Sequence, residues 1–318
     1  MRRINLEFLS KPVAVVALGT DGFGVGRPAE LAESLMEAYV GAGGNLLDSA
    51  RMYGRPEVGE YGLCEALVGR WMEKKGNREG LVLSTKGGYP ALDGSPRLDR
   101  SSLLADLSDS LNALRTDFID LYWLHRDDPA RPVGEIVEAV NALLETGHVG
   151  GVGASNWAPA RIREANAYAE AHGMRGFIGN QPQWSLARQA VNPDPTLQIM
   201  DGESYALHRE RNLLCMPFSA QAKGYFSKLL SGGEAALSPK ARARFHVPEN
   251  VETAGKLAQL CEREGVSPAA MSVAWLTCQP FPTIPVVSAS SVAQLTDTLA
   301  AGDVRLSAAE VRGLRAMD

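Results

Sequence analysis

Eight short apolar runs recur along the chain, and a stretch with the pattern of an amphipathic helix separates most of them. The runs are β-branched or leucine-rich and are bounded by Gly, Asp or Asn, which is typical of strands buried on both faces. Up to the seventh, successive runs begin about 27 to 37 residues apart, the spacing of right-handed βαβ units. The predicted strands are residues 13–18, 45–48, 81–86, 118–124, 149–153, 176–181, 213–218 and 283–287. The pattern predicts an α/β fold, a (β/α)8 TIM barrel that occupies residues 1–318 as a single domain.

Helical patterns fill the intervals between these strands. They cover residues 28–40, 65–75, 103–114, 133–145 and 159–172, and residues 100–102 would cap the third of them. The interval between the seventh and eighth strands is about twice as long as the others. It holds an irregular segment, 219–248, and helical patterns over 251–263 and 268–278. We expect 219–248 to form a long loop over the C-terminal mouth of the barrel, and helices at 291–300 and 307–316 to complete the fold.

Composition restricts the kind of molecule further. The 318 residues carry a net charge of −5 with both signs dispersed, which argues against nucleic acid or an anionic membrane as a partner. No apolar stretch approaches the length of a membrane span, and the first residues lack the apolar region of a signal peptide. The four cysteines are far apart and form no C-x-x-C pair, so we expect neither a structural disulfide nor a metal site. These features predict a cytoplasmic monomer or small homo-oligomer.

Four polar residues lie at or just past the carboxyl ends of the second, third and fourth predicted strands. Asp48 ends the second strand with Tyr53 five residues on, Lys86 ends the third, and His125 follows the fourth. They should converge, because the carboxyl ends of barrel strands meet at one face. Reduction of a carbonyl leaves charge on oxygen, and a tyrosine hydroxyl with a pKa near 10 needs a nearby ammonium to protonate it at neutral pH. Lys86 would be that ammonium, with Asp48 as its counter-ion and His125 as a hydrogen-bond donor to the substrate oxygen.

Each of these residues alone has an ordinary structural interpretation. Asp48 could cap a helix, Tyr53 could lie half exposed in a loop, and Lys86 could reach solvent from the end of its strand. His125 could belong to a polar loop beside Arg126. Their positions after three successive strands favour the catalytic interpretation.

The motifs around these residues resemble the aldo-keto reductases, in particular bacterial members similar to aryl-alcohol dehydrogenases. The segments that carry the resemblance are NLLDSARMYG at 45–54, STK at 84–86, DFIDLYWLH at 117–125, GVGASNW at 151–157 and NQ at 180–181. The resemblance extends from about Val13 to the C-terminus. It implies a (β/α)8 barrel, NAD(P)H bound in extended form without a Rossmann domain, and a tyrosine acid assisted by Asp, Lys and His. By position these residues are Tyr53, Asp48, Lys86 and His125.

The resemblance also implies where the cofactor binds. Ser155, Asn156 and Gln181 match positions that bind the nicotinamide carboxamide, which needs both a donor and an acceptor to fix the face of the ring. Phe218 and Ser219 match an aromatic-Ser pair whose ring stacks on the nicotinamide, where most members carry Tyr-Ser-Pro-Leu. The further cofactor contacts that we expect are Gly19 and Thr20 after the first strand, and Ser288, Ser290, Ser291 and Gln294 around the helix after the eighth.

The adenine end of the cofactor is expected at that last helix. A helix N-terminus with hydroxyl groups can hold phosphate through its N–H groups and dipole, although Ser290 and Ser291 would equally serve as a plain N-cap. Many family members place Lys or Arg there to bind the 2′-phosphate of NADP, and residues 283–302 contain neither. The resemblance therefore implies NADP, with NAD as the alternative.

The substrate is expected to lie among the loops after strands one, two, four, five and seven. Phe23, Met52 and Trp157 would supply apolar walls together with residues 219–248, and Arg126 would supply a polar group. This mixture predicts a polar carbonyl compound, such as a sugar or a polyol.

Three functions are compatible with the sequence. The first is NAD(P)H-dependent reduction of an aldehyde or ketone, or the reverse reaction, with Tyr53 as general acid or base. The second is a barrel lyase or aldolase in which Lys86 forms a Schiff base. The third is a binding subunit that senses nicotinamide nucleotides with little turnover. The matches at Ser155, Asn156 and Gln181 favour the first over the second.

Overall fold

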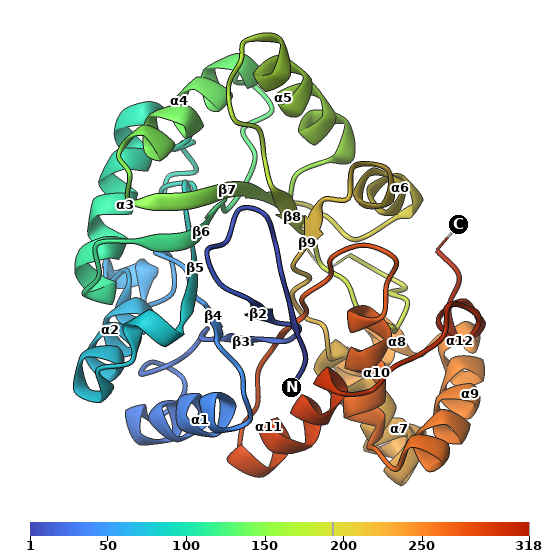
Figure 1. The fold of residues 1–318 in the computed structure, drawn as a ribbon. Helices are drawn as coiled ribbons and strands as arrows, with labels where there is room; N and C mark the ends of the chain where they lie inside the picture. Colours follow the sequence, from blue (N-terminus) through green and yellow to red (C-terminus); the bar gives the residue numbers. More distant parts are fainter. Residues whose placement is uncertain (193, 318) are drawn as a thin grey trace.

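Parallel pairing joins all eight predicted strands into one sheet in the computed structural model, which describes residues 1–192 and 194–317 (Figure 1). The sheet order is β10-β3-β4-β5-β6-β7-β8-β9. Its strands are β3 (Ala17–Gly19), β4 (Leu46–Asp48), β5 (Val82–Gly87), β6 (Ile119–Leu124), β7 (Val149–Ser155), β8 (Gly179–Gln181), β9 (Leu214–Cys215) and β10 (Val286–Val287). A parallel bridge between Cys215 and Thr283 joins β9 to the segment before β10 and closes the sheet. The predicted (β/α)8 barrel is therefore confirmed.

Helices surround this sheet, and Figure 1 shows them as an outer ring. They are α1 (Ala29–Gly41), α2 (Leu63–Lys75), α3 (Arg100–Leu114), α4 (Val133–Glu145), α5 (Pro159–Ala171), α6 (Gly202–Arg211), α7 (Tyr225–Gly232), α8 (Pro239–Phe245), α9 (Pro248–Glu264), α10 (Pro268–Thr277), α11 (Val292–Leu299) and α12 (Ala308–Leu314). The predicted cap of α3 is wrong, because Asp99 is the N-cap and accepts from the Ser102 N–H, while residues 100–102 are helical. No prediction covered α6.

The expectation of an irregular loop over residues 219–248 is wrong. The segment contains the helices α7 and α8, and α9 begins at Pro248. Gly233 ends α7 with a positive φ of 63°, and Ser238 caps α8 by accepting from the Ala241 N–H. The two helices are short because these glycine and serine positions interrupt them. They are held by burial of aromatic side chains such as Tyr225 and Phe245.

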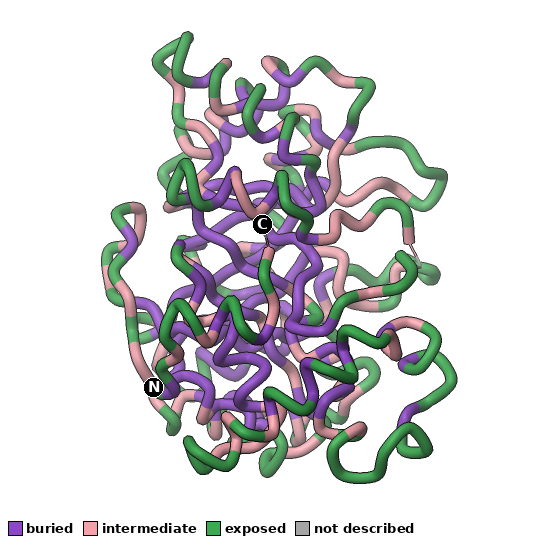
Figure 2. The backbone as a smooth tube through the Cα atoms, turned by 90° about the vertical axis from the view of Figure 1, so that its right-hand side faces the viewer, coloured by how far each residue is buried: buried purple, intermediate pink, exposed green. Residues whose placement is uncertain are grey.

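An antiparallel hairpin closes the N-terminal end of the barrel. Its strands are β1 (Arg3–Ile4) and β2 (Val13–Ala14), so the predicted first strand is divided between β2 and β3. Leu6, in the hairpin loop, packs in one cluster with inward-facing barrel residues such as Val82 and Leu121. Figure 1 shows the hairpin crossing the middle of the barrel, and Figure 2 shows buried residues concentrated at the centre of the molecule. Access to the strand ends is therefore from the opposite, C-terminal face.

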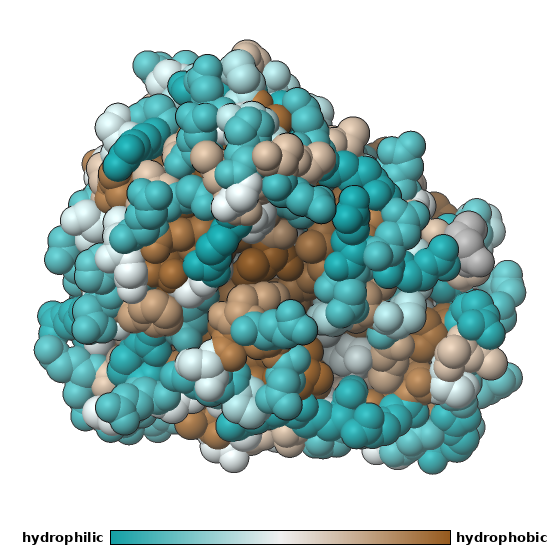
Figure 3. All heavy atoms as spheres, turned by 45° about the horizontal axis from the view of Figure 1, so that its top comes forward, coloured by the Kyte–Doolittle hydropathy of each residue, from teal (hydrophilic) through white to brown (hydrophobic). Residues whose placement is uncertain are grey.

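The outer surface is mostly polar. On the face shown in Figure 3, hydrophilic side chains form the rim, and apolar atoms are gathered in the hollowed middle. None of the helices in the described part of the chain combines the length and hydrophobicity that a membrane crossing requires.

Candidate active site

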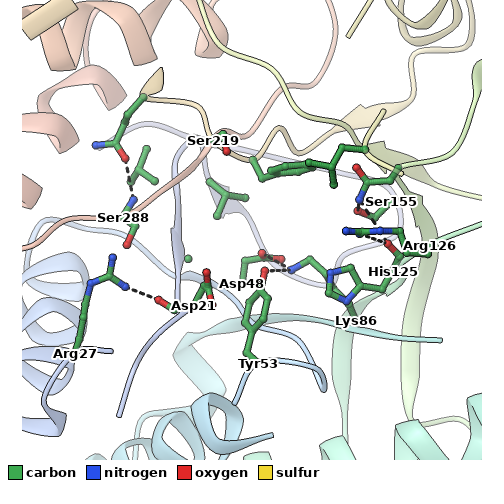
Figure 4. A pocket seen from close by; sticks show the side chains of 17 residues that line it. Asp21, Arg27, Asp48, Tyr53, Lys86, His125, Arg126, Ser155, Ser219 and Ser288 are labelled. Carbon is green, nitrogen blue, oxygen red and sulfur yellow. Dashed lines mark hydrogen bonds and ion pairs between the residues drawn. The ribbon is translucent and has the colours of Figure 1, made fainter. Parts of the chain in front are cut away.

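Lys86 joins two of the other predicted catalytic residues at the C-terminal face (Figure 4). Its Nζ lies 2.6 Å from Asp48 Oδ2 and 3.4 Å from Tyr53 Oη, and donates over 2.7 Å to the carbonyl oxygen of Ser49. These three contacts match the three N–H groups of an ammonium. The lysine and aspartate side chains are buried, and Lys86 Nζ also lies 5.1 Å from the centroid of the Tyr53 ring.

Strand register and hydrogen bonds fix Asp48. It pairs with Ser84 across β4 and β5, which puts both residues at the same level of the barrel. Ser84 Oγ donates to Asp48 Oδ1 over 2.6 Å, and Gln181 Nε2 donates to the same oxygen over 2.9 Å. Trp123 Nε1 in turn donates to Ser84 Oγ over 2.8 Å. Ser84 and Gln181 thus hold one carboxylate oxygen of Asp48, and Lys86 holds the other.

The pKa of Tyr53 depends on burial and on the charges around it. Burial raises the pKa of the phenol, the Lys86 ammonium lowers it, and Asp48 and Asp21 raise it, so that the pKa is about 12. The ammonium alone would lower the pKa, as the sequence suggested, but burial is the larger effect. Burial also lowers the pKa of Lys86, but Asp48 and Tyr53 outweigh it, and the net shift is upward. Lys86 therefore stays charged at neutral pH and Tyr53 keeps its proton.

His125 lies beside Tyr53 as a neutral ring. Its pKa is well below the usual value because the ring is buried and because Lys86 and Arg126 are both positive. The ring packs edge-on against Tyr53, with centroids 6.1 Å apart, and against Tyr89 at 5.0 Å. The structure gives His125 Nδ1 no hydrogen-bond partner among the described residues. A neutral imidazole can present an N–H donor to a substrate oxygen.

These residues line a cavity of about 300 Å³. The predicted residues that it brings together are Gly19, Asp48, Tyr53, Lys86, His125, Arg126, Ser155, Asn156, Phe218, Ser219 and Ser288. Asn156 and Ser219 have positive φ values of 61° and 55°, which non-glycine residues rarely adopt and which are often found at functional sites. The cavity is also lined by Asp21, which follows Gly19 and Thr20 in the segment expected near the cofactor. The cavity residues for which the sequence suggested no role are Arg27, Leu197, Gln221, Val286 and Val287.

A second cavity of about 650 Å³ continues the first, because both are lined by Arg27, Ser219, Gln221 and Ser288. It is also lined by Ser290, Gln294, Lys223 and Lys228. Ser288 Oγ is buried without a hydrogen-bond partner among the described residues. An extended, cation-lined groove that ends beside Tyr53 fits a nicotinamide dinucleotide, since such a cofactor has a ring at one end and phosphates beyond it.

Some predicted residues lie elsewhere. Phe23 and Trp157 are fully buried in the core, so the expectation that they line the substrate cavity is wrong. Met52 lines a separate cavity with Arg51 and Tyr61. Phe23 and Trp157 pack into the core because burial removes the large apolar area of an aromatic side chain from water.

Other predicted cofactor residues make contacts within the protein. Gln181 is completely buried and donates to Asp48. Thr20 is buried, and its hydroxyl lies within hydrogen-bond distance of the Asp48 carbonyl oxygen and of the Ser49 hydroxyl. Ser291 is the N-cap of α11 and accepts from the Gln294 N–H, the plain capping alternative.

The residues of this site belong to a sequence pattern that extends over most of the chain. Residues 15–318 match the family model of the Aldo/keto reductase family. The chain belongs to this family. It is therefore an oxidoreductase that acts on carbonyl or alcohol groups, and its relatives use nicotinamide cofactors.

Curated relatives of this aldo/keto reductase include bacterial and fungal proteins. It is 28% identical to the uncharacterized oxidoreductase YrpG of Bacillus subtilis, over 92% of this chain and 89% of the relative. It is 28% identical to norsolorinic acid reductase stcV of Emericella nidulans, over 89% of this chain and 70% of the relative. It is 25% identical to protein tas of Escherichia coli, over 96% of this chain and 94% of the relative.

Proposed function

We propose that this aldo/keto reductase reduces an aldehyde or ketone with NADPH, or catalyses the reverse reaction, and that Tyr53 transfers the proton. The observation that carries the proposal is Lys86 Nζ, which contacts both Asp48 Oδ2 and Tyr53 Oη at the mouth of the barrel. When bound, the cofactor supplies the hydride. As charge develops on the substrate oxygen, Tyr53 gives up its proton to it, and the adjacent Lys86 stabilises the phenolate that remains. His125 orients the carbonyl as a neutral hydrogen-bond donor.

The same geometry argues against a Schiff base on Lys86. An amine must be neutral to attack a carbonyl. Asp48 and Tyr53 raise the pKa of Lys86, and all its N–H groups have acceptors in contact. The lysine is therefore held as a charged group.

Positive groups beside the second cavity support NADPH over NADH. Residues 283–302 lack a cation, but other segments supply three: Arg27 from the loop after β3, Lys223 from the segment before α7, and Lys228 from α7. A 2′-phosphate adds negative charge, which these side chains would attract. We expect fluorescence titration to give tighter binding of NADPH than of NADH, and Lys223→Gln to reduce the difference. Equal affinities in the wild type would contradict this cofactor choice.

Substitution of the phenol tests the proposed acid. Tyr53→Phe deletes the proton donor and keeps the ring, so kcat should fall by about 10²- to 10⁴-fold while NADPH binding is retained. Tyr61→Phe is the matched control, because Tyr61 is more exposed and lies outside the catalytic cavity. Near wild-type turnover by Tyr53→Phe would refute the assignment. If the wild type binds NADPH but oxidises none of it with any member of an aldehyde, ketone and sugar panel, the protein is a nicotinamide-binding subunit instead.

A further inference from the structure

Arg126 is a cation at the boundary between the catalytic cavity and an outer one. It directly follows His125 at the end of β6 and is partly buried. It lines the cavity that holds Tyr53, and also a cavity of about 600 Å³ on the other side. Figure 4 shows its guanidinium directed inward above His125. A ligand that reaches from either cavity can therefore contact this side chain.

The charges next to Arg126 in the sequence do not neutralise it. Asp127 pairs with Arg161, with Oδ2 and Nε 3.2 Å apart. Asp128 lies 3.7 Å from Arg131 Nε. Within residues 1–192 and 194–317, no carboxylate lies within 4.0 Å of the Arg126 guanidinium. Hydrogen bonds from Thr196 and, to a smaller extent, the charge of Arg126 lower the pKa of Asp194, but this partly exposed carboxylate lies beyond that distance.

The contacts of Arg126 hold it in place without cancelling its charge. Its Nη1 donates to the His125 carbonyl oxygen over 2.8 Å, and its Nε donates to Thr196 Oγ1 over 3.3 Å. Its guanidinium carbon lies 5.1 Å from the centroid of the Tyr89 ring. In the same cavity, Lys86 is neutralised by Asp48. Arg126 thus remains an oriented positive group with no ion-paired carboxylate among the described residues, and burial lowers its pKa.

We infer that Arg126 binds an anionic group of the substrate, so that the preferred substrates are aldehydes or ketones that carry a carboxylate or a phosphate. The inference rests on the proposed carbonyl reduction and specifies its substrate class. A planar guanidinium held on one side by protein acceptors presents its remaining N–H groups in the geometry that oxyanions accept. The anion would compensate a charge that no carboxylate in the described part of the chain pairs with directly.

The position of Arg126 assigns it to the substrate rather than to the cofactor. The groove of about 650 Å³ runs from Ser219 and Ser288 toward Gln294, and Arg126 does not line it. The outer cavity beside Arg126 is lined instead by Tyr89, Pro90, Leu92 and Leu197. The carbonyl would lie beside Tyr53, the anion at Arg126, and any apolar remainder against these side chains.

Matched pairs of substrates test the inference. We would measure kcat/KM for 4-carboxybenzaldehyde against its methyl ester, and for a phosphorylated hydroxyaldehyde against its unphosphorylated parent. The wild type should prefer the anionic member of at least one pair by about 10- to 100-fold, the range of a charge-assisted contact. Arg126→Met should remove most of that preference, and Arg126→Lys should keep part of it. Which pair responds separates a carboxylate from a phosphate.

Two further measurements keep the outcomes distinct. Arg163→Met is the matched control, because Arg163 is exposed on α5 and pairs with Glu210, and it should keep the wild-type ratio. Calorimetric binding of the members of both pairs to the NADP-loaded protein is independent of turnover. If the wild type reduces the two members of each pair equally well, or if Arg126→Met keeps the preference, the inference is wrong and the reductase proposal stands. If none of the aldehydes is reduced, tighter Arg126-dependent binding of an anionic member than of its neutral partner supports the inference even though the reductase proposal fails. Equal binding within both pairs refutes the inference as well.

Discussion

The Lys86–Asp48 ion pair is buried, with side chains 4% and 3% exposed. Removing one partner of such a pair leaves the other as an uncompensated buried charge. We therefore expect Lys86→Met to lower the free energy of unfolding by about 3–5 kcal/mol. The double variant Asp48→Asn with Lys86→Met should recover most of this loss. Urea denaturation of the two proteins measures the difference.

Stability and turnover should separate in these variants. The double variant lacks the ammonium beside Tyr53, so its kcat should stay about 10²- to 10⁴-fold below wild type even where folding is recovered. Recovery of turnover together with stability would show that Lys86 has only a structural role.

At the scale of elements, the N-terminal hairpin seals one end of the barrel. Leu6 is 8% exposed and packs with the inward-facing barrel side chains. We expect Leu6→Ala to lower the free energy of unfolding by about 2–4 kcal/mol, because it leaves a cavity under the barrel. The active-site residues lie at the other end, so kcat should be unchanged. Val58→Ala, at a residue 66% exposed, is the control and should change stability by less than about 0.5 kcal/mol.

The elements also show what the sequence could predict. Apolar runs bounded by turn residues located every barrel strand, and helical periodicity located most of the outer helices. The helices α7 and α8 were missed because their seven or eight residues are too short for a clear period, and tertiary packing stabilises them.

The sequence predicts the part of the candidate site that lies at strand ends, but not the part that lies in loops. Residues at strand ends, such as Lys86 and His125, follow from topology alone. Loop side chains do not, because a loop sequence does not determine whether a residue such as Phe23 points inward. Arg27 was missed for the same reason, since a lone loop arginine carries no signal until the fold places it beside Ser288.

At the scale of the whole molecule, buried titratable side chains make the free energy of unfolding depend on pH. Two of them change it in opposite directions. The pKa of His208 is lowered to about 4 because the ring is buried, so the unfolded chain holds a proton that the folded chain lacks. The neutral, buried ring of His208 therefore contributes stability that is fully present above the ordinary histidine pKa of about 6.5. This stability is lost as the pH falls from there toward about 4. Glu65 acts in the other direction. Burial raises its pKa from 4.5 to about 7, although the Thr85 hydroxyl, 2.6 Å away, lowers it in part.

Glu65 should therefore make the fold weaker as the pH rises. Between about pH 4.5 and pH 7 the folded protein keeps a proton on Glu65 that the unfolded chain has released, so the free energy of unfolding falls across that window, by at most roughly 3 kcal/mol. Glu65→Gln keeps an acceptor for Thr85 and cannot ionise. The difference in stability between the variant and the wild type, measured by urea denaturation, should shift in favour of the variant from pH 5 to pH 8. A difference that stays constant over this range, as expected for the exposed control Glu170→Gln, would show that Glu65 is ionised throughout.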